Sequence, residues 1–159
     1  MIRRKMDSSE PELVLEKIRH YCAYQERCIR DVEERLKDWA VQKKRIPSLI
    51  DQLQKEGYLS EDRFARTFAR GKFRLNKWGR QKIEFELKIR GIPEVTIMEG
   101  MTHIDEKEYL QMLKELILRK QKELRQDEDL NIREKIIDFV LGKGYEMNII
   151  LDQMKKLKI

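Results

Sequence analysis

The sequence is poor in the residues that build metal centres, disulfides and tight turns. It has 2 cysteines, 2 histidines, 3 prolines and 7 glycines among 159 residues. Two cysteines and two isolated histidines do not supply a fourfold zinc ligand set, and we expect Cys22 and Cys28 to be reduced and packed. The scarcity of proline and glycine favours long helices with short connections over a β protein that needs many turns.

Long apolar runs are also missing. No stretch approaches the ~20 apolar residues that a membrane-spanning helix requires. The first residues, MIRRKMDSSEPE, lack the apolar core of a signal peptide. We therefore expect a cytosolic protein with no membrane partner.

The usual signatures of enzymes are absent as well. There is no Gly-rich phosphate loop of the GxxxxGK[ST] or GxGxxG type and no GxSxG elbow. His20 and Cys22 would lie on different faces of one helix, which argues against a catalytic dyad. Because the carboxylates fall at helix starts and in i, i+4 pairs, we expect no catalytic residue, no metal and no cofactor.

What the sequence does contain is a concentration of positive charge between Asp62 and Arg90. This window holds ten basic and three acidic residues, so its net charge of +7 exceeds the +6 of the whole chain. A cationic surface on a nearly neutral frame suggests an anionic partner, such as nucleic acid or an acidic protein groove. The candidate binding residues are Arg63, Arg66, Arg70, Lys72, Arg74, Lys77, Trp78, Arg80 and Lys82.

Four of these residues form a stripe along one predicted helix. Ser60 caps that helix, and the stripe consists of Arg63, Arg66, Arg70 and Arg74. A separate apolar stripe of Phe64, Phe68 and Leu75 is expected in the core. Trp78 has two interpretations, because it can pack the elbow between two helices or anchor a partner by stacking.

Helical periodicity recurs outside the basic window. Helices are predicted from Ser9 to about Arg27, from Cys28 to Ala40, and from Pro47 to a stop at Gly57. A later helix begins at Asp105 and carries Leu110, Leu113, Ile117 and Leu124. An acidic break over 126–130 then leads to Asn131, a helix from Ile132 to Leu141, and a last helix carrying Ile150, Met154 and Leu157.

The segment Lys82–Arg90 is ambiguous by itself. Its apolar residues alternate with charges, as in a half-buried strand, whereas its charges form favourable helical i, i+4 pairs. Internal repetition favours the helix. An offset of 53 residues places Leu87 on Val140 and Gly91 on Gly144, and an offset of 51 places Leu87 on Leu36.

The repetition predicts an all-α chain of three tandem three-helix repeats that form an elongated curved rod. The predicted repeats are residues 8–59, residues 60–104, which carry the basic window, and residues 105–159. We expect the chain to be a monomer.

The central stretch also resembles a known family. The run GYLSEDRFA at 57–65 is followed by GKFR at 71–74, WGR at 78–80, Glu86-Leu87 and RGI at 90–92. This order is similar to the signature of the RecX family, and Arg27-Cys28 and the GKGY run at 142–145 extend the similarity over roughly residues 14–155. Cys28 departs from the usual serine cap, Asp31-Val32 from the common Glu-Leu, and Trp78 from a small or polar residue.

The resemblance implies a regulator of the RecA recombinase, with three three-helix repeats that dock in the groove of the RecA–single-stranded-DNA filament. It implies inhibition of ATP hydrolysis and strand exchange and a limit on filament growth. Two other interpretations remain open. One is direct binding of single-stranded nucleic acid by the central basic face, and the other is a basic helical module on an anionic membrane.

Overall fold

The computed structural model describes residues 11–126 and 131–159. Within these ranges the regular structure is entirely helical. The helices are α1 (Pro11–Tyr24), α2 (Ile29–Asp38), the short 3-10 helix η1 (Lys43–Arg45), α3 (Ile46–Lys55), α4 (Glu61–Asn76), α5 (Arg80–Ile89), α6 (Glu94–Met101), α7 (Glu106–Arg125), α8 (Ile132–Gly142) and α9 (Met147–Lys156).

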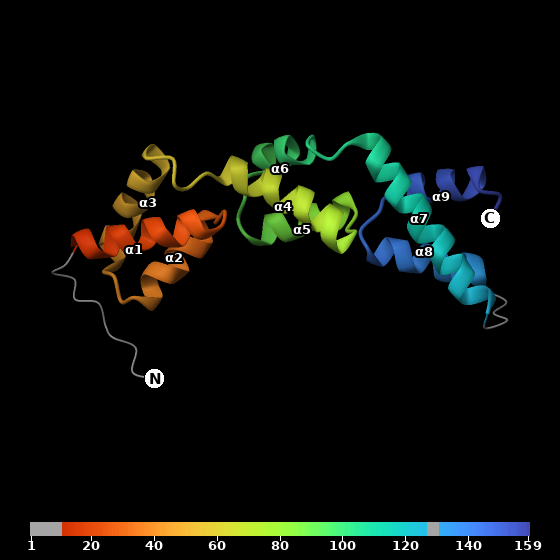
Figure 1. Ribbon diagram of the computed structural model, residues 1–159, viewed down its shortest axis with the longest axis horizontal. Helices are drawn as coiled ribbons and strands as arrows, with labels where there is room; N and C mark the ends of the chain where they lie inside the picture. The colour runs from red at the N-terminus through yellow and green to blue at the C-terminus, as the bar shows by residue number, and fades with distance from the viewer. Residues whose placement is uncertain (1–10, 127–130) are drawn as a thin grey trace.

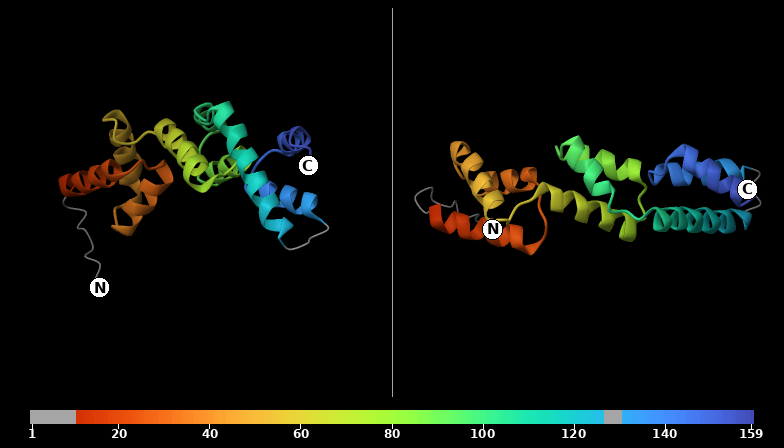
Figure 2. Two further views of the ribbon diagram at one scale, coloured as in Figure 1. Left: turned by 45° about the vertical axis from the view of Figure 1, so that its right-hand side comes forward. Right: turned by 90° about the horizontal axis from the view of Figure 1, so that it is seen from above.

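The helices pack in three successive groups along a rod (Figure 1). The first group is α1–α3, the second α4–α6 and the third α7–α9. In the second and third groups the first helix lies against the following two, whereas in the first group α2 contacts both α1 and α3. Figure 2 shows the same linear order from two other directions. The predicted all-α fold with tandem three-helix repeats is confirmed, and we call the groups the first, second and third repeat.

The segment 82–89 is helical, as the internal repetition predicted, and Arg90 caps the helix. Each repeat ends its second helix with the same turn, in which Ala40, Gly91 and Gly144 have φ angles of 57°, 78° and 99°. The next amide donates to a carbonyl one turn back: Val41 to Leu36 at 3.0 Å, Ile92 to Leu87 at 3.1 Å and Tyr145 to Val140 at 3.2 Å. Residues that follow each turn are buried, which is the pattern of a Schellman motif. Glycine adopts this left-handed conformation without strain, and the first repeat uses alanine instead.

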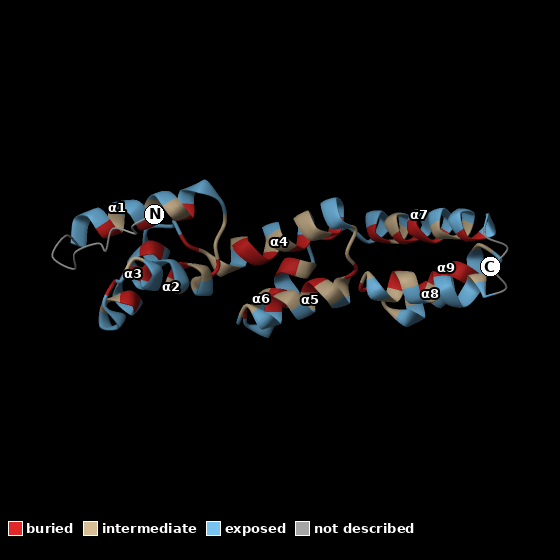
Figure 3. Cartoon of the chain, turned by 90° about the horizontal axis from the view of Figure 1, so that it is seen from below, coloured by how far each residue is buried: buried red, intermediate tan, exposed pale blue. Residues whose placement is uncertain are grey.

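The buried residues lie on the inner faces of the helices (Figure 3) and form two apolar clusters. One cluster fills the first repeat, with Ile18, Val32, Leu36 and Leu53 fully buried. The other runs continuously through the second and third repeats and also includes Cys28. Cys22 and Cys28 are both buried with free thiols, and burial raises the pKa of Cys22 to about 11.

The predicted apolar stripe on α4 was wrong in one position. Leu75 is 84% exposed, although Phe64 is buried and Phe68 half-buried. The buried face of α4 is instead set by Ala65, Ala69 and Phe73. Gly100 in α6 lies so close to Ala65 that a Cβ added to Gly100 would be 3.0 Å from the Cβ of Ala65. The buried face of α4 contains two small residues, Ala65 and Ala69. A prediction based on large apolar side chains alone therefore placed this face too close to Leu75.

The first helix is also shorter than predicted. It ends at Tyr24 rather than near Arg27, and the next residues turn the chain toward α2. The Arg27 side chain explains the end, because its Nε donates to the free carbonyl of Tyr21 at 3.2 Å. The predicted cap at Ser9 and most of the acidic break at 126–130 lie outside the described residues.

Candidate partner-binding surface

The basic window builds α4 and α5 of the second repeat. The Ser60 hydroxyl accepts a hydrogen bond from the amide of Arg63 at 3.2 Å and starts α4, as predicted. Lys77, in the left-handed conformation with φ of 59°, ends it. Gly79 then begins α5 in extended backbone. The candidate residues therefore lie along α4, on the elbow, and on the first turn of α5.

The arginine stripe is not free of carboxylates in three dimensions. Helices and turns that are distant in sequence place an acidic side chain beside three of its four members. These contacts join Arg63 to Glu26 at 2.9 Å, Arg66 to Glu99 at 3.9 Å, and Arg74 to Glu108 at 3.5 Å. Only Arg70 in the stripe forms no ion pair within residues 11–126 and 131–159. The other three arginines hold α4 to neighbouring parts of the chain.

Arg80 lies at the joint between the second and third repeats. Its guanidinium pairs with Glu106 and, at 3.1 Å, with Glu146, and lies 3.8 Å from the ring centroid of Tyr109. Burial alone would lower the pKa of Arg80, but hydrogen bonds to the two carboxylates raise it above the ordinary value. With its side chain 24% exposed and committed to these partners, Arg80 has a structural role at this site.

The same joint contains two buried tyrosines. Tyr109 donates to Glu146 and accepts a hydrogen bond from the amide of Arg80 at 3.1 Å, and the Tyr145 hydroxyl donates to the Lys77 carbonyl at 3.1 Å. Burial and the hydrogen bond to Glu146 raise the pKa of Tyr109, and burial with the nearby charge of Glu146 raises that of Tyr145. Both phenols are held neutral.

Trp78 packs the elbow between α4 and α5, one of the two roles that the sequence left open, and the anchoring of a partner stays a prediction. It is half-buried, packs against the core of the second and third repeats, and meets the Phe68 ring edge-on at 6.4 Å between centroids. Two ammonium groups lie over its ring, Lys72 at 5.0 Å and Lys82 at 4.7 Å from the centroid. We call Lys72, Trp78 and Lys82 the Trp78 cluster.

Four cations of the basic window carry no ion pair in the described chain, and three of them, Lys72, Lys77 and Lys82, lie at or beside this elbow. The ammonium groups of Lys72 and Lys82 lie over aromatic rings, whereas Arg70 lies on the face of α4 that points away from Lys72. An ammonium stacked on an aromatic ring keeps its charge available to an anion. The cations that can still attract an anionic partner are thus Lys77 and those of the Trp78 cluster at the elbow, and Arg70 on the other face of α4.

Two features of this region were not predicted. A groove of about 400 Å³ separates the α1–α2 turn from α4 and is lined by Phe68, Lys72 and the exposed Leu75. A larger cavity, of about 820 Å³, lies on the first repeat among aromatic and basic side chains. Aromatic and basic residues on α1, in the turn after it and along α2 are the signal in the sequence: Tyr21, Tyr24, Arg27, Arg35 and Trp39. The search for charge in the central window did not reveal them.

Neither a metal centre nor a membrane span is found among these helices. No group of three or more metal-ligating side chains occurs in residues 11–126 and 131–159. In the same ranges, no helix combines the length and the apolar character needed to cross a bilayer.

Comparisons with known proteins point to one family. A model for the second three-helix domain of RecX matches residues 60–101, which contain the Trp78 cluster. Regulatory protein RecX from Bacillus cytotoxicus is 25% identical over 138 residues, covering 87% of this chain and 51% of that protein. The Clostridium acetobutylicum protein of the same name is 26% identical over 132 residues, covering 80% and 61%. The chain thus spans only part of the length of these relatives.

Solved structures agree in fold. RecX from Lactobacillus salivarius superposes with a TM-score of 0.84 at 19% identity, over 95% of this chain and 98% of that chain. A second structure, of a regulatory protein RecX, gives 0.83 at 16% identity, over 98% and 80%. The repeated helical turns, the sequence signature and these relatives agree: the chain contains a match to the second three-helix domain of RecX and is similar, in sequence and in fold, to regulatory proteins named RecX.

Proposed function

We propose that this protein binds the filament of RecA recombinase on single-stranded DNA and lowers its ATP hydrolysis, strand exchange and growth. It acts in the cytosol, as a monomer, and by binding alone. A regulator of this kind needs no catalytic group, because differential affinity for one filament state is enough to shift the filament population.

One observation carries the proposal. The part of the chain that matches the RecX model holds Arg70, Lys77 and the Trp78 cluster, whose cations have no carboxylate partner in the described chain. Unneutralised cations around a half-buried aromatic ring suit an acidic protein groove or the phosphates within a filament. The repeats, with boundaries proposed at 8–59, 60–104 and 105–159, follow one another along a rod that can reach more than one subunit.

The experiment measures RecA's DNA-dependent ATP hydrolysis and filament length with increasing protein. The wild type should lower both. A variant with Arg70→Glu, Lys72→Glu and Lys82→Glu should need about tenfold more protein for half-inhibition, because it meets an acidic partner with reversed charge. The matched control reverses Lys114, Lys122 and Lys155, three exposed lysines of the third repeat, and should inhibit like the wild type.

A wild-type protein that changes neither ATP hydrolysis nor filament length would contradict the proposal. Tight binding to bare single strands, lost on charge reversal of Arg66, Arg70 and Arg74, would assign the central face to direct nucleic-acid binding instead. Sedimentation with anionic vesicles would favour a membrane surface, to which the exposed Leu75 could contribute.

A further inference from the structure

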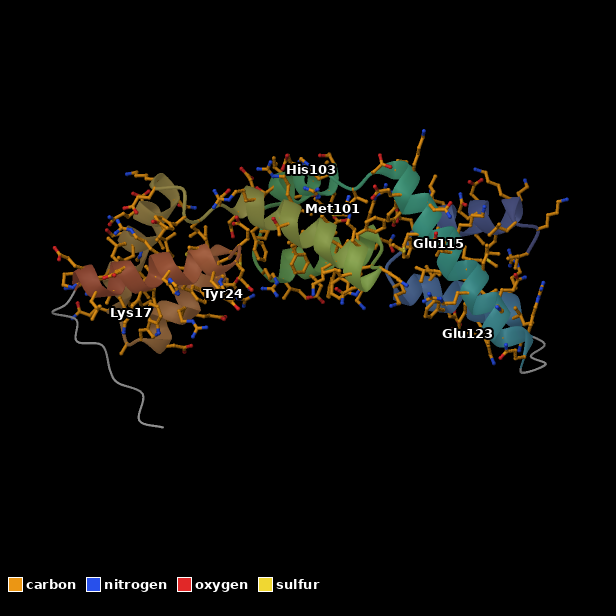
Figure 4. All side chains as sticks on the ribbon, viewed as in Figure 1. Lys17, Tyr24, Met101, His103, Glu115 and Glu123 are labelled. Carbon is orange, nitrogen blue, oxygen red and sulfur yellow. The ribbon has the colours of Figure 1, made fainter. Side chains whose placement is uncertain are left out.

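An open cavity lies on the first repeat, in a different repeat from the Trp78 cluster. It has a volume of about 820 Å³ and is formed by the outer side of α1, the turn after α1, and α2. Lys17 and Tyr24, two of the α1 residues that line it, are labelled in Figure 4. Neither the family match at 60–101 nor the proposed filament contact involves this cavity.

Two guanidinium groups share one aromatic ring in the cavity. The Arg27 Cζ lies 3.8 Å and the Arg35 Cζ 4.7 Å from the ring centroid of Tyr21. Neither arginine forms an ion pair within residues 11–126 and 131–159. Arg19, at the edge of the same cavity, differs in that it is held by Glu56 through two hydrogen bonds of 2.7 and 2.6 Å.

This arrangement favours an anion at the two arginines. Both guanidinium groups contact the same ring and neither forms an ion pair within the described residues, although Glu16 also lines the cavity. Stacking on Tyr21 orients both planar groups. The Arg27 Nε donates to the Tyr21 carbonyl, and the terminal N–H groups of Arg27 and Arg35 can donate to an oxyanion. A phosphate, with several acceptor oxygens, satisfies both edges at once.

The remaining walls of the cavity are aromatic. Tyr24, three residues after Tyr21 on the same helix, is 79% exposed, and Trp39, one turn after Arg35, is half-buried. An exposed ring of this size contributes little to the core. Beside a phosphate site it offers a flat surface on which a nucleobase can stack.

We propose that this cavity binds single-stranded nucleic acid, with a backbone phosphate bound by Arg27 and Arg35 and a base stacked on Tyr24. The combination of unpaired guanidinium groups with several aromatic rings distinguishes it from a site for an acidic peptide, which needs the cations but not the rings. The proposal stands apart from the filament contact, because it assigns bare-strand binding to the first repeat.

The test measures the affinity of a short fluorescent oligothymidylate by anisotropy at several salt concentrations. The double variant Arg27→Gln, Arg35→Gln should bind more weakly and lower the salt slope by about 1 to 2. Tyr24→Ala should weaken binding roughly tenfold, as expected for loss of one stacked base. The charge-matched control, Lys37→Gln with Lys43→Gln, removes exposed lysines of the same repeat outside the cavity and should keep the salt slope closer to that of the wild type.

A second readout locates the strand. The chain has 2 tryptophans, so Trp78→Phe leaves Trp39 as the sole indole, and the oligonucleotide should quench its fluorescence. If the arginine variant has a lower unfolding temperature, Tyr24→Ala decides the matter, because a ring so exposed can be removed without loss of packing.

Three results would overturn the inference. One is equal affinity of the arginine variant and the lysine control for the oligonucleotide. Another is unchanged Trp39 fluorescence at saturation. The third is competition by polyglutamate as effective as that by unlabelled oligonucleotide, with no effect of Tyr24→Ala, which would identify an acidic protein segment as the occupant. None of these results bears on inhibition of ATP hydrolysis, so failure here is distinguishable from failure of the filament proposal.

Discussion

The rod has two joints, and they are built in different ways. Between the first and second repeats, the contacts are made mainly by side chains: Arg63 reaches Glu26 at 2.9 Å, Arg90 reaches Asp31 at 3.4 Å, and Glu61 accepts a hydrogen bond from the Ile29 amide at 3.2 Å. Between the second and third repeats, backbone meets backbone. The Gly79 amide donates to Lys143 at 2.7 Å and the Gln81 amide to Gly144 at 2.9 Å.

The apolar cores divide in the same way. One cluster continues through the second joint, whereas the first repeat has a cluster of its own, and Cys28 is its one buried residue that belongs to the larger cluster. Exposed ion pairs contribute at most about 1 kcal/mol each, while closely packed backbone tolerates almost no change. The second and third repeats therefore behave as one body, and the first repeat is joined to them more weakly.

The largest effect is expected from Gly79→Ala. A Cβ at Gly79 would overlap the backbone of Gly144 and Tyr145, so the second joint must open. We expect a loss of about 3 kcal/mol in the free energy of unfolding, measured in urea. The control is Gly71→Ala, inside α4, where an added Cβ meets nothing within 4 Å and should stabilise the helix by up to about 1 kcal/mol. Equal effects of the two changes would refute the rigid joint.

The next effect concerns the buried hydroxyl of Tyr109. Tyr109→Phe removes its hydrogen bonds to Glu146 and to the Arg80 amide, and leaves both partners poorly satisfied. The free energy of unfolding should fall by about 2 kcal/mol in thermal or urea denaturation. The exposed Tyr24 provides the comparison, since Tyr24→Phe should leave stability unchanged. Similar stability of the two variants would show that the network adds nothing.

Alkaline pH should weaken the second joint in particular. Because the folded pKa of Tyr109 and of Tyr145 lies above the ordinary value of about 10, the folded state holds these protons more tightly than the unfolded chain. Their contribution is fully present below about pH 10 and is lost as the pH rises above it, by at most about 1.4 kcal/mol per pH unit for each phenol. Urea unfolding of the wild type and of Tyr109→Phe should show a shallower slope in the variant. Parallel slopes would contradict the assignment.

The smallest effect is expected at the first joint. A double-mutant cycle with Arg63→Ala and Glu26→Ala should give a coupling energy below about 1 kcal/mol that declines as salt is added. The reason is that both side chains are partly exposed, at 40% and 30%. A coupling of several kcal/mol that salt does not change would mean that the two joints are equally rigid.

Most of the fold could be predicted from periodicity and repetition. The offset of 53 residues correctly made the segment 82–89 a helix, because Leu87 and Val140 occupy equivalent buried positions. The exposure of Leu75 could not be predicted in this way. A helical wheel gives the direction of a side chain but not whether another helix covers it, and α6 approaches the Ala65 side instead.

The candidate site was only partly predictable. The positive charge of α4 and the position of Trp78 are properties of a short stretch and are visible in it. The partners of Arg66 and Arg80 come from Glu99, Glu106 and Glu146, whose proximity depends on how the repeats stack. Local sequence therefore identified the cations but not which of them the fold neutralises.

The weakly bonded first joint has a consequence for affinity. Residues 56–60 connect α3 to α4 by a short path, so in the proposed complex the first repeat remains tethered close to the partner that the second and third repeats bind. Its effective concentration there is on the order of millimolar for a short flexible connection. A contact too weak to be seen with the isolated repeat then prolongs residence of the whole rod. The longer residence requires a first joint that can change its angle. If that angle were fixed in the wrong direction, the first repeat could not reach the partner while the second and third repeats are bound.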